Sequence, residues 1–163
     1  MPYVILTLVL VALDQLVKYL VLQNIPLGGH VPFIPYIVEL TYVQNTGAAF
    51  SMLEGHTWVL TLISAAVSVL LAVVLAKRVF PRRFAMVSLA LILAGAVGNL
   101  IDRLFLGFVT DMFQTLFMNF AVFNVADICV VCGAVMAAAY YLWFYEKYDK
   151  KDAKDGSSDA PTE

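Results

Sequence analysis

Four long runs of apolar residues divide the chain, and short, more polar connections separate them. The runs cover approximately residues 3–22, 58–76, 84–101 and 125–145. A helix needs about 20 mainly apolar residues to cross a bilayer, and each run has about that length. Because backbone polar groups in lipid must be satisfied within the spanning segment, each run is predicted to be a transmembrane helix.

The first run could be mistaken for a cleaved signal peptide. It lacks a basic stretch at its start and a small-residue cleavage site at its end, and it carries Asp14 and Lys18. A cleaved signal peptide has the opposite features. We therefore expect this run to be retained as the first transmembrane helix.

The connections carry weaker signals. Residues 36–44 are β-prone and alternate in part between apolar and polar, which predicts a short strand. The segment 105–123 is rich in Phe and Met, which favours either an aromatic belt or a platform that lies on the bilayer or grips an acyl chain. Residues 149–163 are polar and charged, so we expect a membrane domain over residues 1–148 and a disordered tail over 149–163.

Composition and charge agree with a membrane protein and indicate its orientation. Hydrophobic residues make up 62% of the chain, and the mean hydropathy is +0.86. A net charge of −2 gives no indication of nucleic-acid binding. Basic residues flank cytoplasmic ends of spans, and here they cluster at Lys77, Arg78, Arg82 and Arg83 and at Lys147, Lys150, Lys151 and Lys154. Both termini are therefore expected in the cytoplasm, with residues 23–57 and 102–124 outside.

Polar and ionisable residues gather at the predicted outer ends of these spans. The third span ends with Asn99, Asp102 and Arg103, and the fourth begins with Asn124 and Asp127. Spacings of three and four place each group on one helix face. Ionisable groups at such positions are costly in a membrane, so they indicate a functional site.

Further polar residues can reach the same region. Asp111 lies in the outer connection between the third and fourth spans, and Asn45 lies in the first outer connection. Asp14 and Lys18 share one face of the first span. Purely structural roles remain possible for several of them: an ion pair for Asp14 with Lys18, a helix cap for Asn124 and a turn for Asn45.

Two carboxyls in apolar surroundings have little structural use as lone anions. Held close together, they can share one proton, so that one takes a proton from water and the other protonates a carbonyl oxygen. Asp111 and Asp127 fit this aspartic-protease chemistry. Asp102 is the alternative partner, but its neighbour Arg103 is expected to pair with it and keep it ionised.

Two other functions compete with this one. A metal-dependent membrane transferase could use Asp102, Asp111 and Asp127 to hold Mg²⁺ or Mn²⁺, although Arg103 would oppose a cation. A proton or solute carrier would place its charges near the bilayer midplane. Most of the charges here lie at one end, which counts against transport.

Five motifs together resemble the bacterial lipoprotein signal peptidases, the signal peptidase II family. They are DQLVK at 14–18, NTGAAF at 45–50, GNLIDR at 98–103, VTDMF at 109–113 and FNVAD at 123–127. Val17, Thr110 and Ile128 depart from the usual family residues. The resemblance implies an all-α polytopic membrane protein with four transmembrane helices and a small extracytoplasmic β-sheet on the membrane surface.

The resemblance also implies an activity and roles for single residues. Such an enzyme is an aspartic endopeptidase of the bacterial cytoplasmic membrane, without metal or cofactor. It removes signal peptides just before a diacylglyceryl-modified cysteine, and the cyclic peptide globomycin inhibits it. Asp111 and Asp127 would be catalytic, and the chain is expected to act as a monomer. Supporting residues would be Asp14, Asn45, Asn99, Asp102, Arg103 and Asn124.

Overall fold

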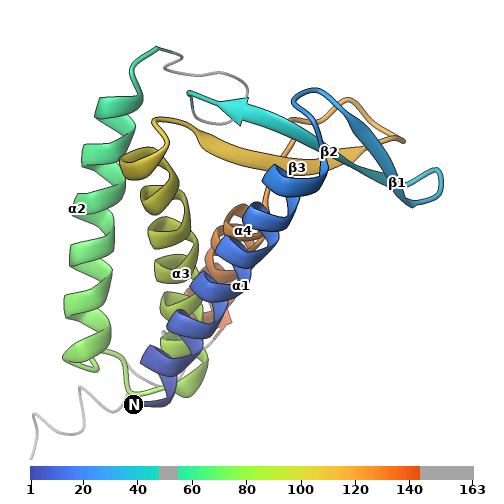
Figure 1. The fold of residues 1–163 in the computed structure, drawn as a ribbon. Helices are drawn as coiled ribbons and strands as arrows, with labels where there is room; N and C mark the ends of the chain where they lie inside the picture. Colours follow the sequence, from blue (N-terminus) through green and yellow to red (C-terminus); the bar gives the residue numbers. More distant parts are fainter. Residues whose placement is uncertain (48–54, 144–163) are drawn as a thin grey trace, which may run out of the picture.

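The computed structural model describes residues 1–47 and 55–143, and four long apolar helices dominate it (Figure 1). They are α1 (Pro2–Asn24), α2 (Thr57–Ala76), α3 (Arg83–Phe105) and α4 (Val125–Tyr140). Each is long and apolar enough to cross a membrane, with the fourth candidate span continuing to Trp143. The prediction of four spans is confirmed. The tail at 149–163, the basic cluster at 147–154 and residues 48–50 of the second motif lie outside the described residues.

The third helix is the centre of the bundle. It contacts α1, α2 and α4, and half of its most apolar window is buried, against 17–22% for the other three helices. It continues past the apolar run to Phe105, so Asp102 and Arg103 lie in its last turn, as expected for residues that end the third span. This extension matters because helical geometry, and not a loop, then fixes both side chains.

Glycines let α3 approach its neighbours closely. A Cβ on Gly98 would lie 2.5 Å from Asp14 Oδ2 and 3.2 Å from Ala126 Cβ. A Cβ on Gly133 of α4 would lie 2.7 Å from the Ser88 carbonyl oxygen of α3. Small residues at such points permit backbone contact between membrane helices. As a result, polar groups on α1, α3 and α4 come within hydrogen-bond distance of one another.

A three-stranded antiparallel sheet lies across one end of the bundle, opposite the N-terminus (Figure 1). Its strands are β1 (His30–Ile34), β2 (Val38–Asn45) and β3 (Val109–Thr115), in the order β1-β2-β3. The strand predicted at residues 36–44 is confirmed as β2. Val43 of β2 pairs with Asp111 of β3, so the sheet carries one of the two candidate catalytic carboxyls.

The sheet is anchored to the end of α1 by a small core. Met112 of β3 and Tyr42 of β2 are buried together with Val21 and Ile25. The Phe- and Met-rich segment is therefore buried only in its middle, at residues 109–112 of β3. Phe105 before the strand and Phe117 after it are 81% and 65% exposed.

Candidate functional site

Two carboxyls from different elements meet around one asparagine. Asn124, at the N-cap of α4, donates from Nδ2 to Asp111 Oδ1 on β3 at 2.6 Å. Its Oδ1 accepts from the Asp127 backbone N–H at 2.9 Å, while its own backbone N–H donates to Asp127 Oδ2 at 3.1 Å. This reciprocal arrangement is a capping box. The cap expected at Asn124 is confirmed, and the same residue holds Asp111.

Two further amides complete the support of these carboxyls. Asn99 of α3 donates from Nδ2 to Asp127 Oδ1 at 2.8 Å. Asn45, at the end of β2, donates from Nδ2 to Asp111 Oδ2 at 2.9 Å and accepts from the Gly47 N–H with its Oδ1. Each carboxyl therefore accepts two hydrogen bonds, which fix its orientation.

The amide of Asn99 is held in one orientation by its other neighbours. Lys18 Nζ donates to Asn99 Oδ1 at 3.0 Å, and Asn124 Nδ2 donates to the same oxygen at 3.1 Å. Because an ammonium group has only donors, the Asn99 atom that faces it must be the oxygen. The Asn99 NH₂ group then faces Asp127. Lys18 thus orients a residue that touches Asp127, which the sequence did not indicate.

Lys18 belongs to a buried charge cluster below the two carboxyls. Its Nζ lies 2.9 Å from Asp14 Oδ2 and 3.1 Å from Asp102 Oδ2, with the lysine and Asp14 side chains only 2% and 1% exposed. Asp102 also accepts from the Thr110 N–H at 2.9 Å, and Asp14 accepts from the Ala126 N–H at 2.8 Å. The cluster therefore joins α1 to α3, β3 and α4.

The expected pairing of Asp102 with Arg103 is wrong, because adjacent residues on a helix point about 100° apart. The cation beside Asp102 is Lys18. The Arg103 guanidinium turns the other way, toward Ser64 Oγ at 3.5 Å and the Gly47 carbonyl oxygen at 3.4 Å. Its Nε is buried and has no hydrogen-bond partner among the described residues.

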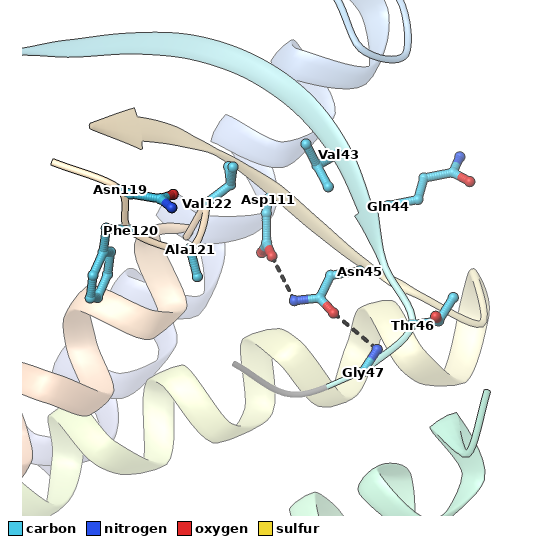
Figure 2. A pocket seen from close by; sticks show the side chains of 10 residues that line it. All are labelled: Val43, Gln44, Asn45, Thr46, Gly47, Asp111, Asn119, Phe120, Ala121 and Val122. Carbon is cyan, nitrogen blue, oxygen red and sulfur yellow. Dashed lines mark hydrogen bonds between the residues drawn. The ribbon is translucent and has the colours of Figure 1, made fainter. Parts of the chain in front are cut away.

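The two carboxyls line a mostly apolar hollow, which we call the apolar cavity. Its volume is about 420 Å³. Asp111, Asp127 and Arg103 contribute polar groups to its wall, and most of the remaining lining is apolar, from segment 120–123 and from Ile128, Val130, Val131 and Cys132 of α4. A second hollow of about 300 Å³ lies beside Asp111 between the end of β2 and segment 119–122 (Figure 2). We call it the polar cavity because Asn45, Thr46, Asp111 and Asn119 give its lining a larger polar share than that of the apolar cavity, although Val43, Phe120, Ala121 and Val122 also line it.

Asp111 is only 2% exposed, and its protonation reflects that burial. Burial raises the pKa of the Asp111 carboxyl to about 7, and the negative charge of Asp127 also raises this pKa. The hydrogen bonds from Asn45 and Asn124 and the charge of Lys18 lower it. Near neutral pH, Asp111 therefore exists in both its protonated and its ionised form, as a group that gives up and regains a proton must.

The donor set does not resemble a metal centre. Within residues 1–47 and 55–143, no three His, Cys, Asp or Glu side chains are grouped so that they could hold a metal ion. The contacts above place all the residues expected in the site at the sheet end of the bundle. These residues are Asp14, Asn45, Asn99, Asp102, Arg103, Asp111, Asn124 and Asp127. Two hydrogen bonds of the site were not expected from the sequence. Lys18 donates to Asn99, and Gln15 donates to Asp102.

The sequence matches a known family over most of its length. The family model described as signal peptidase (SPase) II matches residues 6–143. A lipoprotein signal peptidase of Enterococcus faecalis is 46% identical over 140 residues, which cover 86% of this chain and 87% of that protein. Those of Streptococcus agalactiae and Listeria monocytogenes are 45% and 41% identical, over 88% and 86% of this chain and 92% of each relative.

Two solved structures share the fold. A bacterial membrane enzyme solved by the in meso method at 2.3 Å resolution superposes with a TM-score of 0.81 and 27% identity, over 99% of this chain and 93% of that one. Another, solved by the same method at 1.9 Å, gives a TM-score of 0.79 and 28% identity, over 88% and 94%. The chain therefore shares its fold with two bacterial membrane enzymes.

Proposed function

The chain belongs to the signal peptidase II family, and from this premise we propose that it is an aspartic endopeptidase of the bacterial cytoplasmic membrane. Its substrates would be prolipoproteins, cut just before the diacylglyceryl-modified cysteine. The family relatives are lipoprotein signal peptidases, which supports the substrate class. The observation that carries the catalytic type is the pair of carboxyls, Asp111 and Asp127, held by Asn124 at the edge of one cavity.

We propose that the two carboxyls divide the work of hydrolysis. Asp127, as the carboxylate, takes a proton from water, and the oxygen of that water attacks the scissile carbonyl carbon. Asp111, protonated, donates to the carbonyl oxygen as the tetrahedral intermediate forms. Collapse of the intermediate breaks the C–N bond, returns the carbonyl proton to Asp111 and passes the proton on Asp127 to the leaving amine. The pKa of Asp111, raised to about 7, supports its role as the acid.

The supporting residues would position this pair. Asn45 and Asn99 each donate to one of the two carboxyls, and Asn124 also fixes the start of α4. Asp14 and Asp102 would hold Lys18 in place through ion pairs. Arg103 has an unsatisfied buried Nε beside the apolar cavity, so it is suited to contact bound substrate.

The site would face outward from the bacterial cytoplasmic membrane, where lipid-modified prolipoproteins present their signal peptides. The apolar cavity, with exposed Ile128 and Val131 on α4, would receive the substrate from lipid without requiring it to enter water. We further propose that the enzyme needs no metal and acts as a monomer. Globomycin, a cyclic peptide, would compete for the same cavity.

The proposal is tested with purified protein and a diacylglyceryl-modified prolipoprotein, with the mass of the product as the readout. Asp111→Asn and Asp127→Asn should each abolish cleavage, by at least about 10²–10⁴-fold, while the protein stays folded in detergent. Full activity in a chelator is expected for the wild type. Near-normal turnover by either variant, or activity restored only by Mg²⁺, would replace the proposed dyad with another mechanism.

A further inference from the structure

The apolar and polar cavities adjoin at Asp111. They share five lining residues, Asn45, Asp111, Phe120, Ala121 and Val122, whereas Asp127 lines the apolar cavity. A substrate with its scissile bond at Asp111 and Asp127 would therefore lie along the apolar cavity and meet the polar cavity where its chain passes Asp111. The linings of the two cavities differ enough to indicate which part of the substrate each cavity binds.

The apolar cavity faces the region of the bilayer. Its far wall is formed by α4, on which Ile128 and Val131 are 42% and 61% exposed. Since α4 is long and apolar enough to span a membrane, those exposed side chains would lie against lipid. Apolar groups attached to the substrate would be favoured on this side.

The polar cavity lies at the sheet end, away from the spans. Residues 44–47 at the end of β2 form one wall, and segment 119–122 forms the other. Asn119 points toward Asp111 across the cavity, whereas the side chain of Gln44 points away from it (Figure 2). Asn45 already bonds Asp111 and the Gly47 N–H, so polar groups for a ligand on this side come from the amide of Asn119 and from the backbone at the end of β2.

A prolipoprotein has a direction that matches these two walls. Its signal helix precedes the scissile bond, and its acyl chains are attached to the cysteine that follows, so both of these groups belong in lipid. Only the chain after that cysteine leaves the membrane. Resting on the proposed function, we propose that the polar cavity binds the one or two residues that follow the modified cysteine, and that Asn119 selects small polar side chains there.

The size and chemistry of the cavity set this preference. A volume of about 300 Å³ is at the lower end of the range for ligand pockets, roughly 300–1,000 Å³, which suits a short extended segment. The Asn119 amide can both donate and accept hydrogen bonds. Because Val43, Phe120, Ala121 and Val122 also line the cavity, the preference depends on Asn119. A large apolar side chain beside it would displace water from the amide without replacing the hydrogen bonds of that water.

The test compares two lipid-modified substrates that differ only after the cysteine, one with Ser-Ser and one with Leu-Leu. The wild type should cleave the Ser-Ser substrate with the lower KM. Asn119→Leu should raise this KM about three- to tenfold, which corresponds to the loss of one hydrogen bond, while kcat stays unchanged. Asn119 lies on the surface, so folding is not at risk. Gln114→Leu, on β3 but outside both cavity linings, is the matched control and should keep the wild-type preference.

Three results would overturn the inference while leaving the proposed function intact. The first is no preference between the substrates in the wild type. The second is an unchanged KM in Asn119→Leu, and the third is an equal loss with both substrates. A wild type that cleaves neither lipid-modified substrate would instead reject the proposed function itself.

Discussion

Among single residues, Lys18 shows how a buried charge can act at a distance. Its three ammonium protons have three acceptors, on Asp14, Asp102 and Asn99. Two of these are carboxylate oxygens, with which the buried lysine forms ion pairs. The third is the amide whose other end donates to Asp127. We therefore expect the cluster to stabilise the fold and to fix the orientation of the Asn99 amide beside Asp127.

Replacing Lys18 should separate those two roles. Lys18→Met leaves two buried carboxylates unpaired, so we expect a loss of stability of about 3–5 kcal/mol, measured by thermal unfolding in detergent. The triple variant Asp14→Asn/Lys18→Met/Asp102→Asn removes all three charges and should recover much of this stability. Its activity should remain about 10²-fold low, because Asn99 is no longer oriented. Full activity in the stable triple variant would show that Lys18 is only structural.

The pH dependence of cleavage should follow the protonation of Asp111. As the proposed acid it must be protonated, and its pKa is raised to about 7. The rate should therefore fall as pH rises through about 7. Steady-state cleavage of one lipid-modified substrate between pH 4 and 9 measures this. A rate that stays constant up to pH 9 would exclude Asp111 as the acid.

The same shift has a consequence for stability with a defined sign. The folded protein holds the Asp111 proton more tightly than the unfolded chain, whose carboxyl has the usual pKa of 3.8. The contribution to stability is thus complete below 3.8 and is lost as pH rises toward about 7. Asp111→Asn should flatten this part of the stability curve, in thermal unfolding at a series of pH values.

At the scale of elements, the helices were predictable and two of the three strands were not. The length and composition of an apolar run identify a transmembrane helix, and the sequence predicted all four spans. Residues Val109 to Met112 of β3 are all buried, so the alternation that marks a strand is missing. β1 contains Pro32 and is exposed throughout, so it too lacks a pattern.

Helix packing also depends on a feature that composition hides, namely the close contact at Gly98. Gly98→Ala would bring a methyl group to 2.5 Å from Asp14 Oδ2 and 3.2 Å from Ala126 Cβ, so the Asp14 carboxylate must leave its place beside Lys18. Overpacking of this kind costs roughly 1–3 kcal/mol, and we expect a lower Tm in detergent together with reduced activity. Leu104→Ala on the same helix, at a position that is 60% exposed, is the control and should change the Tm little. Equal effects of the two variants would argue against the contact.

For the molecule as a whole, the motifs indicated which residues form the site but not how they pair. Asp102 and Arg103 are neighbours in sequence, which suggested an ion pair. The actual cation, Lys18, comes from a helix that lies more than 80 residues away in the chain. Only the packing of α1 against α3 reveals it. The second, polar cavity likewise depends on the sheet bringing β2 opposite segment 119–122.

Orientation in the membrane is the property of the whole molecule that the proposed function most needs. Lys77, Arg78, Arg82 and Arg83 lie around the α2–α3 connection, at the same end as the N-terminus, and the sheet with Asp111 lies at the other end (Figure 1). Positive charge marks the cytoplasmic side, so the sheet should face outward. The test uses a background with Cys129→Ala and Cys132→Ala. Tyr36→Cys, in the turn between β1 and β2 where Tyr36 is 89% exposed, should react with an impermeant maleimide in intact protoplasts. Val79→Cys, at the opposite end where Val79 is 56% exposed, should react only after permeabilisation. The reverse labelling would place the dyad on the cytoplasmic side, where exported prolipoproteins cannot reach it.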